Sequence, residues 1–205
     1  MEHQPVANGP LPMSATPVAP ARPLSRAAPT PTAQRARAAT FTLTRATALP
    51  YVWAVARLLM AWTFLWPFFD KLIGLNHQTT TAQAWINGGN PTKGFLSGSV
   101  GFLSGFYTSI AGAGIVNWLF MVGLLAVGIA LAFGIAIRFA AVAGSIMLLA
   151  MWSASLPPSD DLILDNHIIY AVLLIGLALV GAGNTLGFGR RWAQTTLVQR
   201  YPWLT

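Results

Sequence analysis

The sequence predicts an all-α membrane protein, a bundle of four transmembrane helices with a long, partly helical outer loop between the first and second helices. Two observations lead to this prediction. Of the 205 residues, 55% are hydrophobic and only 8% are charged, whereas a soluble globular domain carries roughly 25% charged residues. After Pro50, four long apolar stretches follow one another, each near the roughly 20 residues that cross a bilayer core of about 30 Å.

The first 49 residues predict a disordered, basic cytoplasmic tail. They hold eight of the 14 prolines and five of the 12 basic residues. They contain no apolar run of the length found in a signal peptide. A segment of this composition buries too little apolar surface to offset the entropy of ordering.

A membrane domain is expected over residues 50–189, followed by a cytoplasmic segment over 190–205. Its helices should cover about 51–75, 115–137, 139–156 and 166–183, with the outer loop at 76–113. The alternating pattern of membrane β-strands is missing from the sequence. We expect helical structure in the outer loop because a structureless apolar loop of this length is improbable. Its repeated Gly-Phe-Leu-Ser-Gly segments also have the small-residue spacing of close helix contacts.

The basic residues indicate the orientation of the helices. The net charge is +7, and most Lys and Arg residues fall in the tail, at the turn between the second and third helices and after the fourth helix. By the positive-inside rule, both termini are cytoplasmic and the larger loops face outward. The chain is therefore expected to be a multi-pass cell-membrane protein whose partner is the lipid bilayer, and nucleic-acid binding is not predicted.

Ionisable residues near the outer helix ends are the first candidates for function, because charge within a bilayer is costly. Asp70 and Lys71 end the first helix, and their side chains point to different faces, so at least one should meet another segment. Asp165 or Asn166 is a ready N-cap for the fourth helix. His167 can exchange protons near neutral pH, and Tyr170 lies on the same face. We expect these groups to converge at one depth, with Asp70, Lys71 and His167 as the catalytic residues.

A second set of residues is expected to bind substrate or quinone. Purely structural interpretations remain open for the same residues. Arg57 could extend to the cytoplasmic headgroups, and the tryptophans could form an interfacial belt. His167 could be structural, and Lys93 could lie in an ordinary loop. The expected binding residues are Arg57, Trp66, Trp85, Asn90, Lys93, Trp152, Asp165 and Tyr170.

Several kinds of redox centre are not predicted. The chain has no cysteine, which excludes disulfides, Cys-ligated zinc and iron–sulfur clusters. Its three histidines are His3, His77 and His167, and they do not fall on facing helices at one depth, as a haem would require. The glycine-rich segment 181–187 is one residue too long for a dinucleotide fingerprint and follows an apolar helix. No haem, flavin or metal is therefore expected.

Several of these features together resemble the DoxX/DoxD membrane family over about residues 50–204. They are Arg57, the Phe-Leu-Trp-Pro-Phe-Phe-Asp-Lys-Leu segment at 64–72, the Trp-Ile-Asn-Gly-Gly-Asn-Pro-Thr-Lys-Gly-Phe loop at 85–95, the Asp-Asn-His-Ile-Ile-Tyr start at 165–170 and the Gly-Ala-Gly-Asn-Thr-Leu-Gly exit at 181–187. DoxD-like members are described as the large subunit of a thiosulfate:quinone oxidoreductase. The resemblance implies membrane quinone as co-substrate, thiosulfate as donor and a second redox subunit as partner.

The resulting hypothesis places a quinone ring near Trp66 and Trp152, with Asp70, Lys71 and His167 supplying hydrogen bonds and protons. Lys93 would hold the anionic donor. Because the sequence offers no electron-storing group, donor and quinone would meet directly or another subunit would relay the electrons. Two alternatives remain: a non-catalytic membrane subunit that anchors or stabilises a redox complex, and a small-solute or lipid-handling bundle. A homo-oligomer is a further candidate assembly.

Overall fold

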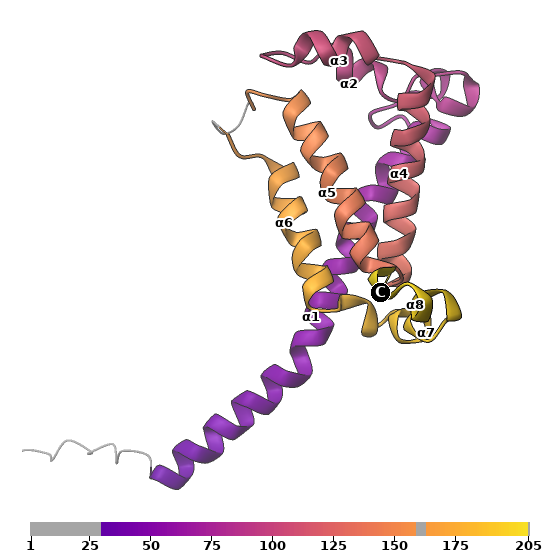
Figure 1. Ribbon diagram of the computed structural model, residues 1–205. Helices are drawn as coiled ribbons and strands as arrows, with labels where there is room; N and C mark the ends of the chain where they lie inside the picture. Colours follow the sequence, from indigo (N-terminus) through magenta and orange to yellow (C-terminus); the bar gives the residue numbers. More distant parts are fainter. Residues whose placement is uncertain (1–29, 159–162, 205) are drawn as a thin grey trace, which may run out of the picture. The chain divides into compact units, whose positions relative to one another are not determined.

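The computed structural model describes residues 30–158 and 163–204, and its regular structure there consists of helices and turns without a strand (Figure 1). The four longest helices are α1 (Pro31–Ile73), α4 (Gly114–Phe133), α5 (Ile137–Ala154) and α6 (Asn166–Leu179). The shorter helices are α2 (Lys93–Ser97), α3 (Ser104–Ile110), α7 (Gly189–Ala193) and α8 (Thr196–Arg200). The 3-10 turns are η1 (Thr81–Gln83), η2 (Trp85–Asn87), η3 (Ala182–Asn184) and η4 (Pro202–Leu204).

Among the described residues, three helices have the length and composition to cross a membrane. These segments are Ala46–Ile73 within α1, Gly114–Phe133 and Ile137–Ala154. The fourth helix, α6, is equally apolar but has only 14 residues, which corresponds to about 21 Å at 1.5 Å per residue. The prediction of an all-helical membrane protein is thus confirmed in its coarse form, with three candidate spans and one shorter apolar helix.

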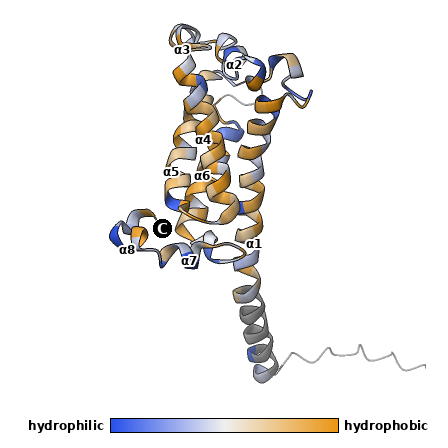
Figure 2. Cartoon of the chain, turned by 90° about the vertical axis from the view of Figure 1, so that its right-hand side faces the viewer, coloured by the Kyte–Doolittle hydropathy of each residue, from blue (hydrophilic) through white to orange (hydrophobic). Residues whose placement is uncertain are grey.

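The outer faces of these helices are apolar, as expected for contact with lipid. Large side chains on all four helices are exposed, with Leu59 65% exposed, Leu119 67%, Ile146 64% and Val172 65%. Figure 2 shows hydrophobic colour along α4, α5 and α6 and along the upper part of α1. A water-soluble protein rarely exposes continuous apolar surface of this kind.

Glycines allow the helices to approach closely in the core. A Cβ on Gly128 of α4 would lie 2.6 Å from Leu65 of α1, and one on Gly144 of α5 would lie 2.8 Å from Leu174 of α6. Such small residues are typical of helix crossings in membranes, where tight packing replaces hydrophobic driving force. The fully buried side chains around these crossings include Phe64, Met121, Leu131, Leu174 and Leu177.

The helix α1 begins 20 residues earlier than predicted. It starts at Pro31, so the expectation of a disordered tail is wrong for residues 31–49, while residues 1–29 lie outside the described residues. The chain divides into units 1–40 and 41–205, and the boundary falls within this helix. The early start has a physical reason: proline is well tolerated in a first helical turn, the stretch that follows is rich in alanine and arginine, and extending a formed helix is far easier than nucleating one.

The turn between α4 and α5 is sharper than the sequence suggested. Helix α4 ends at Phe133 rather than at 137, because Gly134 takes a left-handed conformation with φ of 70°. Its amide donates to the Leu131 carbonyl, and the Ile135 amide donates to the Ala130 carbonyl. This paired arrangement is the usual glycine-dependent end of a helix.

The buried side-chain amide of Asn117 in α4 helps to hold the segment between α1 and α4. Its Oδ1 accepts from the Thr92 amide at 3.1 Å and from the Thr92 hydroxyl at 2.7 Å. Its Nδ2 donates to the Asn90 side chain and to the Gly112 carbonyl. Asn117 is only 5% exposed, so these bonds satisfy a polar group that would otherwise be costly to bury.

Candidate functional site

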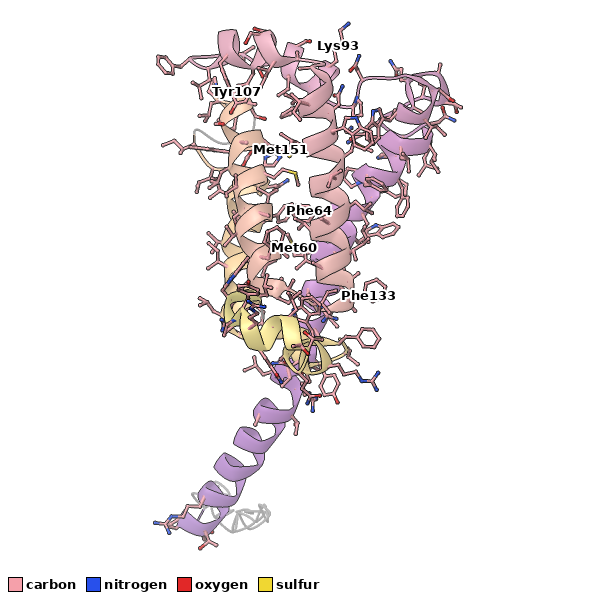
Figure 3. The ribbon with its side chains drawn as sticks, turned by 45° about the vertical axis from the view of Figure 1, so that its right-hand side comes forward. Met60, Phe64, Lys93, Tyr107, Phe133 and Met151 are labelled. Atoms are coloured by element: carbon pink, nitrogen blue, oxygen red, sulfur yellow. The ribbon has the colours of Figure 1, made fainter. Side chains whose placement is uncertain are left out.

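A cavity of about 490 Å³ lies between the long helices, at the end where α2 and α3 are. We call it the central cavity. Its volume falls in the range of pockets that hold drug-sized ligands. Figure 3 shows the labelled Phe64 and Met151 between the helices, with Tyr107 closer to the α3 end. The lining residues are Thr63, Phe64, Pro67, Lys71, Gln78, Pro91, Thr92, Phe95, Leu96, Tyr107, Ile110, Val116, Phe120, Leu124, Met147, Leu148, Ala150, Met151, His167 and Tyr170.

The central cavity is mostly apolar, with a small number of polar groups from different helices. Lys71 comes from α1, Tyr107 from α3, and His167 and Tyr170 from the start of α6. Such a pattern is typical of sites that bind a largely apolar ligand and orient it through a few polar contacts. Three predicted site residues, Lys71, His167 and Tyr170, therefore line one cavity.

The start of α6 fixes the position of His167. The Oδ1 atom of Asp165 accepts from the His167 amide at 2.9 Å and from the Ile168 amide at 3.4 Å, which makes Asp165 the N-cap. Its other oxygen, Oδ2, lies 2.6 Å from Nδ1 of the His167 ring. One carboxylate thus caps the helix and orients the imidazole.

A second cavity of about 500 Å³, here called the end cavity, adjoins the same helix start. Asp165, Asn166 and His167 line it together with residues from the end of α5 and from the segment 95–100. His167 is shared by both cavities, whereas Asp165 lines only the end cavity.

Asp70 does not join the central cavity. Its side chain is 1% exposed, and both carboxylate oxygens lack a hydrogen-bond partner among the described residues. This agrees with the prediction that the side chains of Asp70 and Lys71 point to different faces, since Lys71 lines the cavity and Asp70 does not. A buried carboxyl without partners is energetically costly.

Arg57 lies apart from the other predicted site residues, 14 positions before Lys71 in α1, about 21 Å along a helix. Its guanidinium is fully buried and donates to the Leu186 carbonyl at 2.7 Å and to the Ala182 carbonyl at 3.4 Å. A Cβ on Gly134 would lie 2.0 Å from Arg57 Nη1, and one on Gly187 would lie 2.2 Å from it. Arg57 therefore neither extends to the lipid headgroups nor lines the central cavity. It connects α1 to the 182–187 segment through its hydrogen bonds.

The three tryptophans do not line the central cavity as the hypothesis expected. Trp66 packs against His77, with ring centroids 5.8 Å apart, and Trp85 packs edge-on against Trp118 at 4.6 Å. Trp152 donates its Nε1 proton to the Ile163 carbonyl at 2.8 Å. For Trp66 the reason is its position around the helix. Thr63, Pro67 and Lys71 lie on the face of α1 that lines the cavity, and Trp66 lies on another face.

The two loop residues also take other positions. Asn90 bonds to Asn117 and so belongs to the loop support. Lys93 is exposed and is not among the cavity-lining residues, and Figure 3 shows it at the extreme α2 end. The geometry therefore does not support the expectation that Lys93 holds an anion above the cavity. The lysine that lines the cavity is Lys71.

Some residues of the site were missed by the sequence reasoning. Tyr107 lines the cavity, and its hydroxyl bonds to Ser153 and to the Ala150 carbonyl, which holds α3 against α5. Met147 and Met151 supply a flexible apolar wall. Their spacing of four residues was a usable signal, since it places both side chains on one helix face.

Within the described residues, no three His, Asp or Glu side chains come together as a metal site would need. Comparisons with protein-family models, with curated proteins and with solved structures found no match to this chain.

Proposed function

We propose that this protein is a DoxX/DoxD-like membrane protein that binds a membrane quinone in the central cavity and links its reduction to oxidation of a reduced sulfur anion such as thiosulfate. The observation that supports this most is the composition of the cavity wall. Apolar side chains from α1, α4 and α5 suit a ring and its isoprenoid tail, while Lys71, His167 and Tyr170 offer polar contacts to the quinone oxygens.

The proposal includes a four-span topology in which α6 is the shortest span and both termini are cytoplasmic. Arg190, Arg191 and Arg200 lie on α7 and α8. The amide of Phe188 bonds to the carbonyl of Phe133 at 2.8 Å, so the start of α7 is at the α4–α5 turn beside Arg138. Figure 1 shows α2 and α3 at the other end of the long helices. This concentration of arginine at one end favours a cytoplasmic location for it.

The reaction balances without further reagents. Two thiosulfate anions each give up one electron and join through a new S–S bond to form tetrathionate. The quinone accepts the two electrons together with two protons and becomes a quinol. Lys71 would stabilise negative charge that develops on a quinone oxygen, and His167 would donate a proton to it. The electrons pass by direct approach of the donor or through a second subunit.

The test is a quinone-reduction assay with purified protein in lipid vesicles, a short-chain quinone and thiosulfate, followed through quinone absorbance. Lys71→Met removes the cavity cation, and Lys93→Met is the matched control because that lysine is exposed and outside the cavity. We expect Lys71→Met to slow reduction about tenfold or more, the scale of one lost electrostatic contact in a transition state. The control should retain wild-type activity.

Two results would count against the proposal. If the wild-type protein neither reduces nor binds the quinone, the protein would be a non-catalytic membrane subunit or would take another ligand. If Lys71→Met reduces quinone at the wild-type rate, the reaction would not use the central cavity.

A further inference from the structure

We infer that His167 and Asp165 form a proton-transfer pair that carries protons from the end cavity to the quinone in the central cavity. This inference rests on the proposed function and adds to it a route for the protons. It assigns a role to the end cavity, and it makes Asp165 a positioning residue that acts through His167.

The position of His167 carries the inference. Of the described residues, Phe95 and His167 line both cavities, and of these two only His167 can carry a proton. The ring is 23% exposed and the Asp165 side chain 15% exposed, so the pair is accessible without being a free surface group. A ring in this position can donate a proton to a ligand of the central cavity and take one up from water in the end cavity.

The contact with Asp165 determines which ring nitrogen exchanges the proton. Nδ1 lies 2.6 Å from Asp165 Oδ2, and a carboxylate in this position accepts the Nδ1 proton. Nε2 is then the atom that binds and releases the transferred proton. Because Asp165 Oδ1 is held by two backbone amides, the carboxylate cannot swing away while the ring is protonated.

The two cavities differ in polarity, as a route that takes protons from water to a quinone requires. The end cavity presents Ser155, Asp165 and Asn166, polar groups that suit water. The central cavity presents mainly apolar side chains, and its other titratable groups are Lys71 from α1, Tyr107 from α3 and Tyr170 from α6. The lining residues of α4 and α5 include no titratable group.

The proton balance is simple. The Nε2–H bond of the imidazolium breaks and an O–H bond forms on the reduced quinone oxygen. Water in the end cavity then returns a proton to Nε2, and the same route supplies the second proton of the quinol. The electrons come from the donor of the proposed function, so the pair itself undergoes no redox change.

The experiment compares three variants in the quinone-reduction assay, each with quinone affinity and a pH profile measured. His167→Gln removes the transferable proton. Asp165→Asn keeps a good N-cap but removes the carboxylate oxygen that accepts from the ring. His77→Gln is the matched control, because that histidine is exposed and lines neither cavity.

We expect His167→Gln to bind quinone as the wild type does but to reduce it about a hundredfold more slowly, the usual scale for loss of a general acid. Added imidazole should restore part of the rate, which a purely structural defect would not allow. Asp165→Asn should bind quinone as the wild type does but reduce it more slowly, because the ring loses the carboxylate that orients it. The control should match the wild type.

Three outcomes are distinguishable. An active wild type with an equally active His167→Gln, or one with an unchanged pH profile, overturns the proton route while leaving the quinone reaction in place. Loss of quinone binding in His167→Gln would make this histidine a binding residue and would also overturn the route. An inactive wild type that binds no quinone refutes the proposed function and the route together.

Discussion

Substitution of Gly134 by alanine should be among the most destabilising single-methyl changes in this protein. Gly134 has a φ of 70°, and an added Cβ would lie 2.0 Å from Arg57 Nη1 and 3.0 Å from the Gly183 Cα and carbonyl oxygen. The neighbouring backbone leaves little room, so the guanidinium must move. When it moves, its bond of 2.7 Å to the Leu186 carbonyl is lost or distorted.

The expected cost is the sum of two terms. An alanine in the left-handed region costs about 1–2 kcal/mol. Loss of a hydrogen bond made by a buried charged group costs about 1.5–3 kcal/mol. The free energy of unfolding should therefore fall by about 2.5–5 kcal/mol. For a chain of this size, each kcal/mol corresponds to roughly 2–4 °C in Tm.

The assay is thermal unfolding of the purified protein in detergent, followed by helical circular dichroism. Gly88→Ala is the matched control, because Gly88 also has a positive φ, 86°, but a Cβ there would meet nothing within 4 Å. It should show only the backbone term of about 1–2 kcal/mol. In an Arg57→Met background, Gly134→Ala should cost less than in the wild type, because the clash with Nη1 is absent and only the close contacts with the Gly183 backbone remain. If Gly134→Ala and Gly88→Ala lower Tm equally in the wild-type background, the argument that Arg57 is confined by its glycines is wrong.

Three further substitutions test other parts of the structure. Asn117→Leu removes the buried amide that holds the segment before α4, so limited proteolysis should cut residues 85–97 faster while the α4 and α5 peptides stay protected. Tyr107→Phe removes the hydroxyl bonds to Ser153 and Ala150 and should lower the free energy of unfolding by about 0.5–1.5 kcal/mol; a loss above 3 kcal/mol in denaturant titration would mean that the ring packing had changed as well. Gly144→Val should destabilise the protein by about 1–3 kcal/mol, the usual cost of overpacking, because its Cβ position is 2.8 Å from Leu174; an unchanged Tm would contradict the tight contact of α5 with α6.

The apolar helices could be predicted well from the sequence because composition and length alone define them. Helix α5 was expected at 139–156 and lies at Ile137–Ala154. The ends were less predictable, since they depend on single backbone conformations such as that of Gly134. The start of α1 at Pro31 was not predicted, because the many prolines of residues 1–49 indicated disorder. The alanine-rich stretch after Pro31 nevertheless forms a helix.

The candidate site was only partly accessible from the sequence. Side-chain chemistry and chain reversal were enough to suggest that Lys71, His167 and Tyr170 could share a cavity. Arg57 could not be assigned, because its partners are backbone carbonyls 125 and 129 positions away, and carbonyls have no signature in a sequence. The position of Trp66 depended on helical phase, where a shift of one residue rotates a side chain by about 100°.

The most direct test of the central claim is photolabelling with a photoreactive short-chain quinone, followed by mass-spectrometric mapping of the labelled residues. The cavity-lining Met147 and the lipid-facing Ile146, 64% exposed, are neighbours in sequence and provide an internal comparison. If the central cavity binds quinone, label should appear on Met147, Met151 and Phe120 and should disappear when unlabelled quinone is added in excess. Label confined to Ile146 and other exposed side chains, and unaffected by the competitor, would contradict a quinone site in this cavity.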